Sequence, residues 1–366
     1  MSHLESVTHR KNKLSNVTAS QIPKDKFKFL LSRGRAVDLK IVINGFEILK
    51  TMGMGGHEEF NYECGLSNEA QVAARTELRE DEKTREQALE QFRHWIQKHP
   101  TIRKCRTDAV FLLRFLRTKK FSVPMAQDML ERYLTIRQLY PNWFQNLDIE
   151  DPDIEAIIDS GYLVPLLERD ENGRQVILSC AGRFDPYKYT SAQMARAHSL
   201  VVESLMDHEE NQVRGYTHVN DESGLTMGHV SAWSLTDIRN MLRCIQNSTP
   251  MRHKETHFIN IPSCATKIIE FAVSLLNDKL RARIHIHKSL DELKQAINPK
   301  ILPKEYGGKI PLSEMIASFK KTLHAKRDQL KALDDMYIEI SPKDSCAASS
   351  EGLGGISGSF RKLEVD

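Results

Sequence analysis

The chain has 366 residues, of which 40% are hydrophobic and 28% are charged, and its formal net charge is +3. This length allows two domains plus tails, and the composition is ordinary for a soluble globular protein. A net charge this small excludes attraction of anionic partners by the protein's overall field, so any such preference must come from local patches.

Residues 1–66 are predicted to form a flexible basic leader. This stretch ends in a Gly-rich patch, Met52–Gly56, which does not lie between a clear strand and a clear helix, so a linker is a better interpretation than a phosphate-binding loop. Val37–Gly45 has the pattern of a short strand and turn. The N-terminus has no apolar segment of the kind found in secretory signals.

Residues 67–147 have helical patterns throughout. Ser67 or Asn68 can cap a long charged helix that Pro100 stops. The next helix follows Asp108, with its apolar residues facing inward and Arg114 and Arg117 on the opposite side. A third helix starts near Pro124, which suits a first helical position. These patterns predict an all-helical domain.

Residues 152–310 alternate between strand and helix patterns. The apolar runs Tyr162–Leu167 and Gln175–Cys180 flank an Asn-Gly turn, which predicts a hairpin. Strands separated by helices imply crossover connections, so the predicted fold class is α/β with a mainly parallel mixed sheet. Residues 311–366 are predicted to hold a C-terminal helix and, beyond about Met336, a disordered Ser/Gly-rich tail.

The segment Pro250–Arg283 is the most informative part of the chain. A strand pattern is followed by a helix with an apolar face and with basic residues at both flanks, where cations at the helix C-terminus also suit the helix dipole. Such a helix can cover an apolar ligand and rest on an anionic membrane. The alternative, for this segment by itself, is an ordinary amphipathic core helix.

Catalytic and metal-binding motifs are missing from the sequence. There is no Gly-x-Ser-x-Gly, no Walker loop, no His-Glu-x-x-His and no Cys-x-x-Cys. His285 and His287 lie on one face of a predicted strand near His257, but structural histidines are a better interpretation than a metal site. The six scattered cysteines indicate reduced thiols in the cytosol, and no apolar run is long enough to cross a bilayer. We expect a binding protein that is not an enzyme.

Four motifs, in order, resemble the CRAL-TRIO lipid-binding family, which includes cellular retinaldehyde-binding protein and α-tocopherol transfer protein. They are the helical signature Phe111–Phe121, the hairpin around Arg169–Arg174, the strand Pro250–Pro262 that leads to a lid, and the pair Lys279–His287 and Ile301–Gly308. The resemblance covers about residues 67–310. It implies a helical bundle followed by a lipid cage, which a mobile helical lid at about 262–280 closes.

The resemblance also implies particular site residues. The lid residues are Ile268, Ile269, Ala272, Leu275 and Leu276. In α-tocopherol transfer protein a basic cleft beside the lid binds phosphatidylinositol bisphosphates, and the matching positions here are Arg117, Arg252, Lys254, Lys279, Arg281 and Arg283. No catalytic residue, metal, cofactor or nucleic acid is implied. The expected partners are a hydrophobic lipid and phosphoinositide-containing membranes, such as endosomal or plasma membranes, which a cytoplasmic protein visits transiently.

The sequence leaves two functions open. One is a carrier that transfers a retinoid, tocopherol or similar lipid between membranes. The other is a phosphoinositide-recruited adaptor in membrane trafficking that transfers no cargo. The segment Val219–Gly224 is unusually polar for the family, and His218 and His229 are expected at or near lining positions. These departures leave the identity of the ligand open.

Overall fold

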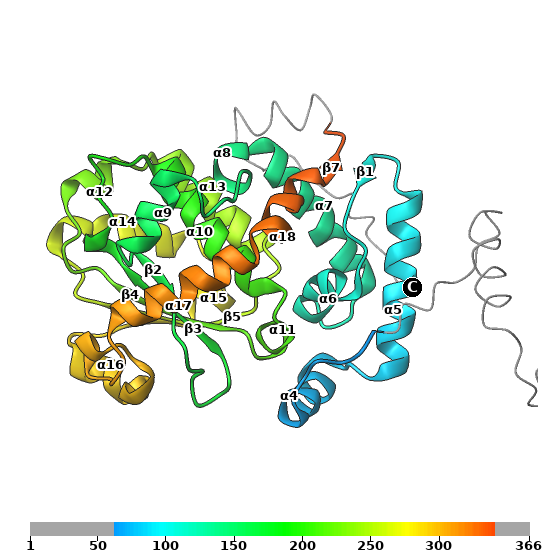
Figure 1. The fold of residues 1–366 in the computed structure, drawn as a ribbon, viewed down its shortest axis with the longest axis horizontal. Coiled ribbons are helices and arrows are strands. Elements are labelled where there is room, and N and C mark those ends of the chain that lie inside the picture. The colour runs from blue at the N-terminus through cyan, green and yellow to red at the C-terminus, as the bar shows by residue number, and fades with distance from the viewer. Residues whose placement is uncertain (1–61, 341–366) are drawn as a thin grey trace, which may run out of the picture. The chain divides into compact units, whose positions relative to one another are not determined.

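The computed structural model describes residues 62–340. Most of the predicted leader, the Gly-rich patch, the strand pattern Val37–Gly45 and the Ser/Gly-rich tail lie outside these described residues. Figure 1 shows the described part of the chain as a ribbon, coloured from blue at its N-terminal end to orange-red at its C-terminal end.

The first part of the chain is mainly helical, but the prediction of an all-helical domain over residues 67–147 is wrong at strand β1 (Ile102–Lys104). Its elements are α4 (Asn68–Ala73), a π-helical turn (Ala74–Leu78), α5 (Glu82–Lys98), α6 (Ala109–Thr118), α7 (Val123–Leu139) and α8 (Pro141–Phe144). The prediction of one long helix up to Pro100 is wrong. Arg79 adopts a left-handed conformation with φ 65°, which ends the first helical segment, and the Asp81 side chain caps α5 by accepting from the Thr84 N–H.

An aromatic core holds this helical region together. Phe92 of α5, Phe111 and Phe115 of α6, and Tyr133 of α7 are buried and meet edge to face, with ring centroids 5.3 to 6.3 Å apart. This geometry favours contact between the positive edge of one ring and the negative face of the next. The apolar periodicity of these helices therefore corresponds to a real core.

A small sheet joins the helical region to the C-terminal end of the described chain. Strand β1 (Ile102–Lys104) pairs antiparallel with β7 (Tyr337–Ile338), which follows α17 (Leu312–Ala325) and α18 (Arg327–Lys331). The helix predicted after residue 311 is therefore present. The prediction of disorder from about Met336 is wrong for β7, because its backbone is paired and Ile338 is buried.

The main sheet has five strands in the order β2-β3-β4-β5-β6. They are β2 (Leu163–Pro165), β3 (Gln175–Cys180), β4 (Tyr216–Asp221), β5 (His253–Ile259) and β6 (Ile284–Ile286). Strands β2 and β3 form the predicted antiparallel hairpin, whereas the other neighbouring pairs are parallel. The fold class is therefore the mainly parallel α/β arrangement expected from the sequence.

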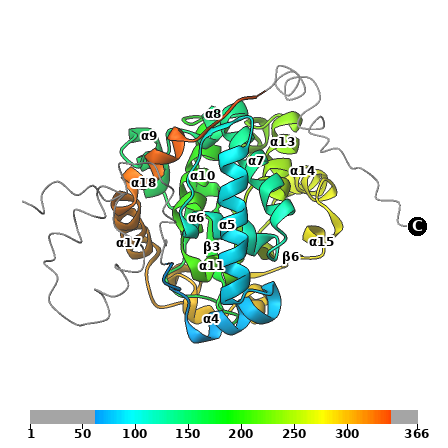
Figure 2. The same cartoon turned by 90° about the vertical axis from the view of Figure 1, so that its right-hand side faces the viewer.

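Helices connect and cover these strands. They are α9 (Pro152–Asp159), α10 (Ser191–Met206), α11 (Glu209–Arg214), α12 (Met227–Ser231), α13 (Leu235–Asn247), α14 (Ser263–Ser274), α15 (Asp278–Arg281) and α16 (Leu290–Ala296). Figures 1 and 2 together place α17 on one side of the sheet and α14 and α15 on the other. None of the helices between residues 62 and 340 has the length and apolar character needed to span a membrane.

The two faces of the main sheet have different chemistry. On one face, Val176, Leu178, Val219 and Ile259 are buried in a closed apolar core together with residues of α16 and α17. The alternate positions on the same strands face the other way, because successive side chains of a strand point to opposite faces. That second face includes residues that line an internal cavity, namely Ile177, Ser179, His218, Asn220, Thr256 and Phe258.

Candidate functional site

The internal cavity lies between the main sheet and helices α10, α13 and α14. It has two lobes, of about 310 and 350 Å³, which share lining residues and so adjoin. The shared residues are His198, His218, Asn220, Met241, Leu242, Ile269 and Ala272. Most other lining side chains are apolar, including Val202, Ile245 and Val273 in the first lobe and Leu225, Val230 and Trp233 in the second.

Helix α14 forms the wall of the cavity away from the sheet. Of the predicted lid residues, Ile269 and Ala272 line both lobes, Leu276 lines the first and Ile268 lines the second. Leu275 is half-buried and does not line either lobe. Ala265 is the only fully buried residue of α14, so this helix is held less firmly than a core helix such as α10.

One end of α14 is fixed to α13 by an amide side chain. Gln246 donates from Nε2 to the Leu275 carbonyl at 3.2 Å, and its Oε1 accepts from the Asn277 backbone N–H at 2.8 Å and from the Asn277 side chain at 2.9 Å. These bonds hold the turn between α14 and α15. At the other end, Pro262 precedes the first turn of α14, and no side chain caps that turn.

A second cavity, of about 590 Å³, adjoins the first lobe and is basic. Its charged lining residues are Lys119, Lys120, Arg252, Lys254, Lys279 and Arg283, with Glu77 as the one carboxylate among them. Glu77 lies 3.1 Å from both Arg252 and Lys254. Six cations therefore face a single carboxylate, which leaves a strongly positive surface. We call this cavity the basic cleft.

The positive charges of the basic cleft repel one another. Burial and the nearby Arg283, Lys120 and Arg252 lower the pKa of Lys279. Burial, followed by Arg132 and Lys279, also lowers the pKa of Lys119. Among residues 62–340 the structure records no ion pair for either lysine. An anion bound here would relieve this repulsion and form charge-assisted hydrogen bonds.

Four of the six residues predicted for phosphoinositide binding line the basic cleft: Arg252, Lys254, Lys279 and Arg283. Arg281 does not line it. The Arg281 guanidinium instead donates to the carbonyls of Ser274 and Leu276, at 3.3 and 2.8 Å. Two lysines that sequence reasoning missed, Lys119 and Lys120, do line the cleft. Their signal was available, because they lie inside the helical motif Phe111–Phe121.

Arg117 requires a correction. Its side chain is fully buried and lines neither the cavity nor the basic cleft. The guanidinium donates to Glu80 at 2.7 and 2.9 Å, to Glu209 at 2.8 Å and to Gln212 at 2.8 Å. Because these acceptors already satisfy its charge and its hydrogen-bonding capacity, Arg117 is not available to a phosphate group.

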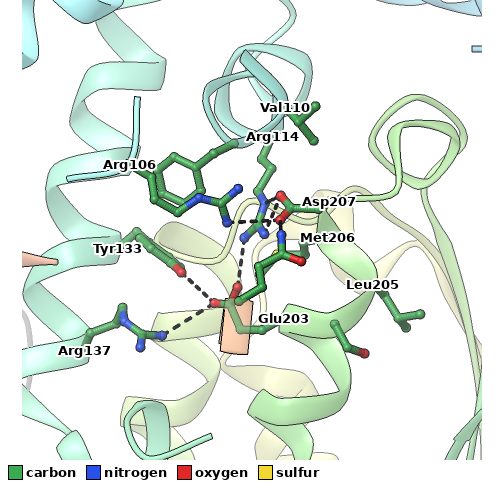
Figure 3. A network of polar contacts seen from close by, with 12 residues as sticks. Arg106, Val110, Arg114, Tyr133, Arg137, Glu203, Leu205, Met206 and Asp207 are labelled. Atoms are coloured by element: carbon green, nitrogen blue, oxygen red, sulfur yellow. Dashed lines mark hydrogen bonds and ion pairs between the residues drawn. The ribbon is translucent and has the colours of Figure 1, made fainter. Parts of the chain in front are cut away.

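Arg114 is also buried, although it was predicted to lie on the outer side of its helix. Figure 3 shows its guanidinium between Glu203 at 2.8 Å and Asp207 at 2.6 Å, and Arg106 also contacts Asp207, at 3.0 Å. Tyr133 also donates to Glu203, at 2.7 Å. Since Glu203 and Asp207 belong to the end of α10, these arginines fasten the helical region to a wall of the cavity.

Histidines connect the cavity to the basic cleft. His253 lines both, and its Nδ1 lies 3.1 Å from Nε2 of His218. Burial first, then His198 and Arg283, lowers the pKa of His253 to about 4, so this side chain is neutral near pH 7. His218 and His229 both line the cavity, as expected from their positions in the sequence.

Another histidine group lies on the face of β5 and β6 opposite the cavity. Nδ1 of His257 lies 2.9 Å from Nε2 of His287, and the ring of His285 stacks on His257. No group of three or more His, Cys, Asp or Glu side chains within residues 62–340 is placed to hold a metal ion. The five cysteines in this part of the chain are all free thiols.

Comparisons with known proteins agree with this architecture. One family model, described as CRAL/TRIO domain, matches residues 159–308, and another, described as Pinta-like, UBA domain, matches residues 81–154. Clavesin-1 of Xenopus laevis is 34% identical over 253 residues, which cover 69% of this chain and 76% of the relative. Clavesin-2 of Homo sapiens is 32% identical over 292 residues, which cover 77% of this chain and 89% of the relative.

A solved structure, that of Sfh5, covers 73% of this chain and 99% of its own, with 12% sequence identity and a TM-score of 0.44. This likeness is too slight to add to the sequence comparisons.

Proposed function

This chain belongs to the CRAL-TRIO family of lipid-binding proteins, and from that premise we propose that it carries a hydrophobic small molecule and transfers it between membranes. The apolar cavity holds the cargo, which is a retinoid, a tocopherol or a similar lipid. The basic cleft binds the headgroup of phosphatidylinositol bisphosphate at the target membrane. No step in this function requires a catalytic group.

One observation carries this proposal: the apolar cavity and the basic cleft adjoin near the C-terminal end of α14. We call this helix the cover, because it forms the wall of the cavity away from the sheet. Leu280 and Arg283 line both the first lobe and the basic cleft. The first contributes an apolar surface to the cavity, and the second a positive charge to the cleft. A phosphorylated headgroup in the cleft therefore lies next to the cargo and to the end of α14, where it can influence whether the cover is closed.

The energetics of the two sites suit transfer. Burial of apolar surface contributes about 25 cal/mol per Å², so the cavity can compete with a bilayer for a lipid of matching shape. Each Lys or Arg near an anionic membrane contributes about 1 kcal/mol, and the six cations of the basic cleft lie on one surface.

The cargo is tested by native mass spectrometry of the full chain purified from its own cells. We expect a lipid bound in a one-to-one ratio that survives purification and can be extracted into organic solvent. A protein that purifies with an empty cavity, and that takes up no lipid from vesicles, would refute the carrier function. Membrane binding without cargo would then support the trafficking adaptor.

The basic cleft is tested by flotation with vesicles that contain or lack phosphatidylinositol 4,5-bisphosphate. The test variant is Lys254→Ala with Lys279→Ala, which removes two of the cleft's positive charges. The matched control is Lys300→Ala with Lys304→Ala, which removes two exposed charges outside the cleft. We expect the test variant alone to lose phosphoinositide-dependent flotation. Equal flotation of both variants would reject the cleft as the headgroup site.

A further inference from the structure

The sheet face inside the cavity is not uniformly apolar. Ser179 on β3 lies opposite Asn220 on β4, and His218 on β4 lies opposite Thr256 on β5. All four side chains line the cavity. A band of polar groups therefore crosses the middle of a wall whose neighbours, such as Ile177 and Phe258, are apolar. A ligand that lies along this wall meets hydrogen-bonding groups at a fixed depth.

Glu222 lies just beyond this band, directly after β4, and lines the second lobe. Within the described part of the chain, no ion pair or side-chain hydrogen bond is recorded for its carboxyl group. Asn220 is likewise without a side-chain partner there. Both side chains are half-buried and line an apolar lobe without a recorded partner, whereas polar groups in apolar surroundings are normally hydrogen-bonded.

The neighbours of Glu222 do not neutralise it. No Lys or Arg is among the residues that line the second lobe. His229 is already engaged, because Nε2 lies 2.8 Å from the Phe184 carbonyl and Nδ1 lies 3.0 Å from the Thr226 hydroxyl. The nearest charge is that of Asp221, which is held by Tyr306 and Asn260. Burial, followed by Asp221, raises the pKa of Glu222 to about 7.

We propose that the second lobe recognises the hydroxyl group of a lipid alcohol, and that Glu222, together with Asn220, determines this specificity. A hydroxyl group both donates and accepts, so it can pair with a carboxyl group in either protonation state. A carboxylate or phosphate headgroup would meet Glu222 with no cation nearby. A pure hydrocarbon would leave both polar groups unpaired. This inference rests on the proposed function, whose cargo class it narrows.

The arrangement separates two kinds of polar headgroup. The second lobe shares no lining residue with the basic cleft, and only the first lobe lies between them. An alcohol is therefore held at Glu222, whereas a phosphorylated headgroup is held by the cations at the other end. Cargo and membrane lipid thus occupy different sites, and their binding does not require them to displace each other directly.

The test is a competition between oleyl alcohol and oleic acid, which share one hydrocarbon chain and differ in the headgroup. The full chain is loaded from an equimolar mixture of the two, repurified and extracted, and the bound lipids are quantified by mass spectrometry. We expect wild type to retain at least about fivefold more alcohol than acid, since a lost or unfavourable polar contact of this kind costs about 1 to 3 kcal/mol. Glu222→Gln should reduce this ratio, and Glu222→Lys should invert it.

The matched control is Glu270→Lys, which makes the same charge change at an exposed position of α14 that does not line the cavity. It should keep the wild-type ratio. If wild type retains neither lipid, the proposed function fails together with this inference. If wild type retains lipid without preferring the alcohol, or if all three variants share the wild-type ratio, only the inference fails. Because Glu222→Gln preserves the shape of the side chain, it keeps the test decisive if the lysine variant does not fold.

Discussion

Two groups of cations lie a few residues apart on one segment, and they have opposite environments. Arg114 and Arg117 on α6 are buried against carboxylates of α10, α11 and the segment before α5. Lys119 and Lys120, which follow directly, line the open basic cleft, and the structure records no ion pair for them within residues 62–340. The role of a cation in this segment therefore depends on which carboxylates lie within reach of it. The residue type and the motif that contains the cation do not determine that role.

The largest effect is expected for the buried group. Arg117→Ala takes the ion-pair partner from Glu209 and leaves Glu80 with only Arg85, at 3.7 Å, among the described residues, which costs about 3 to 5 kcal/mol of unfolding free energy. Urea denaturation followed by circular dichroism measures this loss. Lys120→Ala, three residues away and exposed, is the control and should change stability by less than about 0.5 kcal/mol. Equal losses of unfolding free energy in the two variants would contradict the difference between the buried arginines and the open lysines.

The open group should show the reverse behaviour. Lys119→Ala with Lys279→Ala removes two charges that already repel their neighbours, so the fold should keep its stability. Binding to vesicles with phosphatidylinositol 4,5-bisphosphate should weaken by about 2 kcal/mol, or roughly thirtyfold, at about 1 kcal/mol per lysine. Co-sedimentation at several salt concentrations measures it. Unchanged binding at low salt would show that these lysines do not contact the headgroup.

His253, at the inner edge of the basic cleft, is a third kind of basic residue, because its burial keeps the side chain neutral. His253 faces His218, His198 and Arg283, and its pKa is lowered to about 4. Between pH 6.5 and 4 the unfolded chain binds a proton here that the native protein does not, so stability falls as the pH falls through this window.

His253→Gln should therefore reduce the loss of unfolding free energy between pH 7 and pH 5 by about 1 to 2 kcal/mol. Glu222 acts in the opposite direction, because its pKa is raised to about 7. The informative quantity is therefore the difference between His253→Gln and wild type in the change of unfolding free energy from pH 7 to pH 5. Urea denaturation at the two pH values measures it, with exposed His324→Gln as the control. Identical pH dependence in wild type and His253→Gln would exclude this account.

The smallest effect concerns the one carboxylate that lines the basic cleft. Glu77→Gln removes a charge that competes with any bound anion for Arg252 and Lys254. We expect phosphoinositide binding to tighten by about threefold, since a half-exposed ion pair of this kind is worth less than about 1 kcal/mol. Isothermal titration with a soluble inositol phosphate measures the change. Weaker binding would mean that Glu77 positions the cations for the headgroup.

Much of the fold was predictable because its signals are local. The Asn-Gly turn indicated the β2–β3 hairpin, and the alternation of strands and helices indicated the parallel sheet. The break between α4 and α5 was not predictable from helical periodicity, because the charged sequence remains helical in character on both sides of Arg79. Strand β7 was missed since its pairing partner, β1, lies more than two hundred residues earlier in the chain.

Part of the site was predictable, again because its signal is local. The basic cleft is lined by Arg252, Lys254, Lys279 and Arg283, which flank β5 and α14 in one continuous motif. The position of Arg117 depends on Glu80 and Glu209, which no local pattern connects to it. The polar band on the cavity wall depends on strand register, which places Ser179 beside Asn220 only once the sheet is formed.

The hydrogen bonds of Gln246 to Leu275 and Asn277, which we call the clamp, limit how α14 can move away from the cavity. These bonds hold the turn at Leu275 and Asn277, whereas the far end of α14, near Ser263, has no capping side chain. Since this turn comes directly before Lys279 and Arg283, a displacement of α14 that keeps these bonds would leave both cations nearly in place. Under the proposed function, a headgroup in the basic cleft would then stay bound while lipid is loaded and unloaded, and exchange would not require the protein to leave the membrane surface.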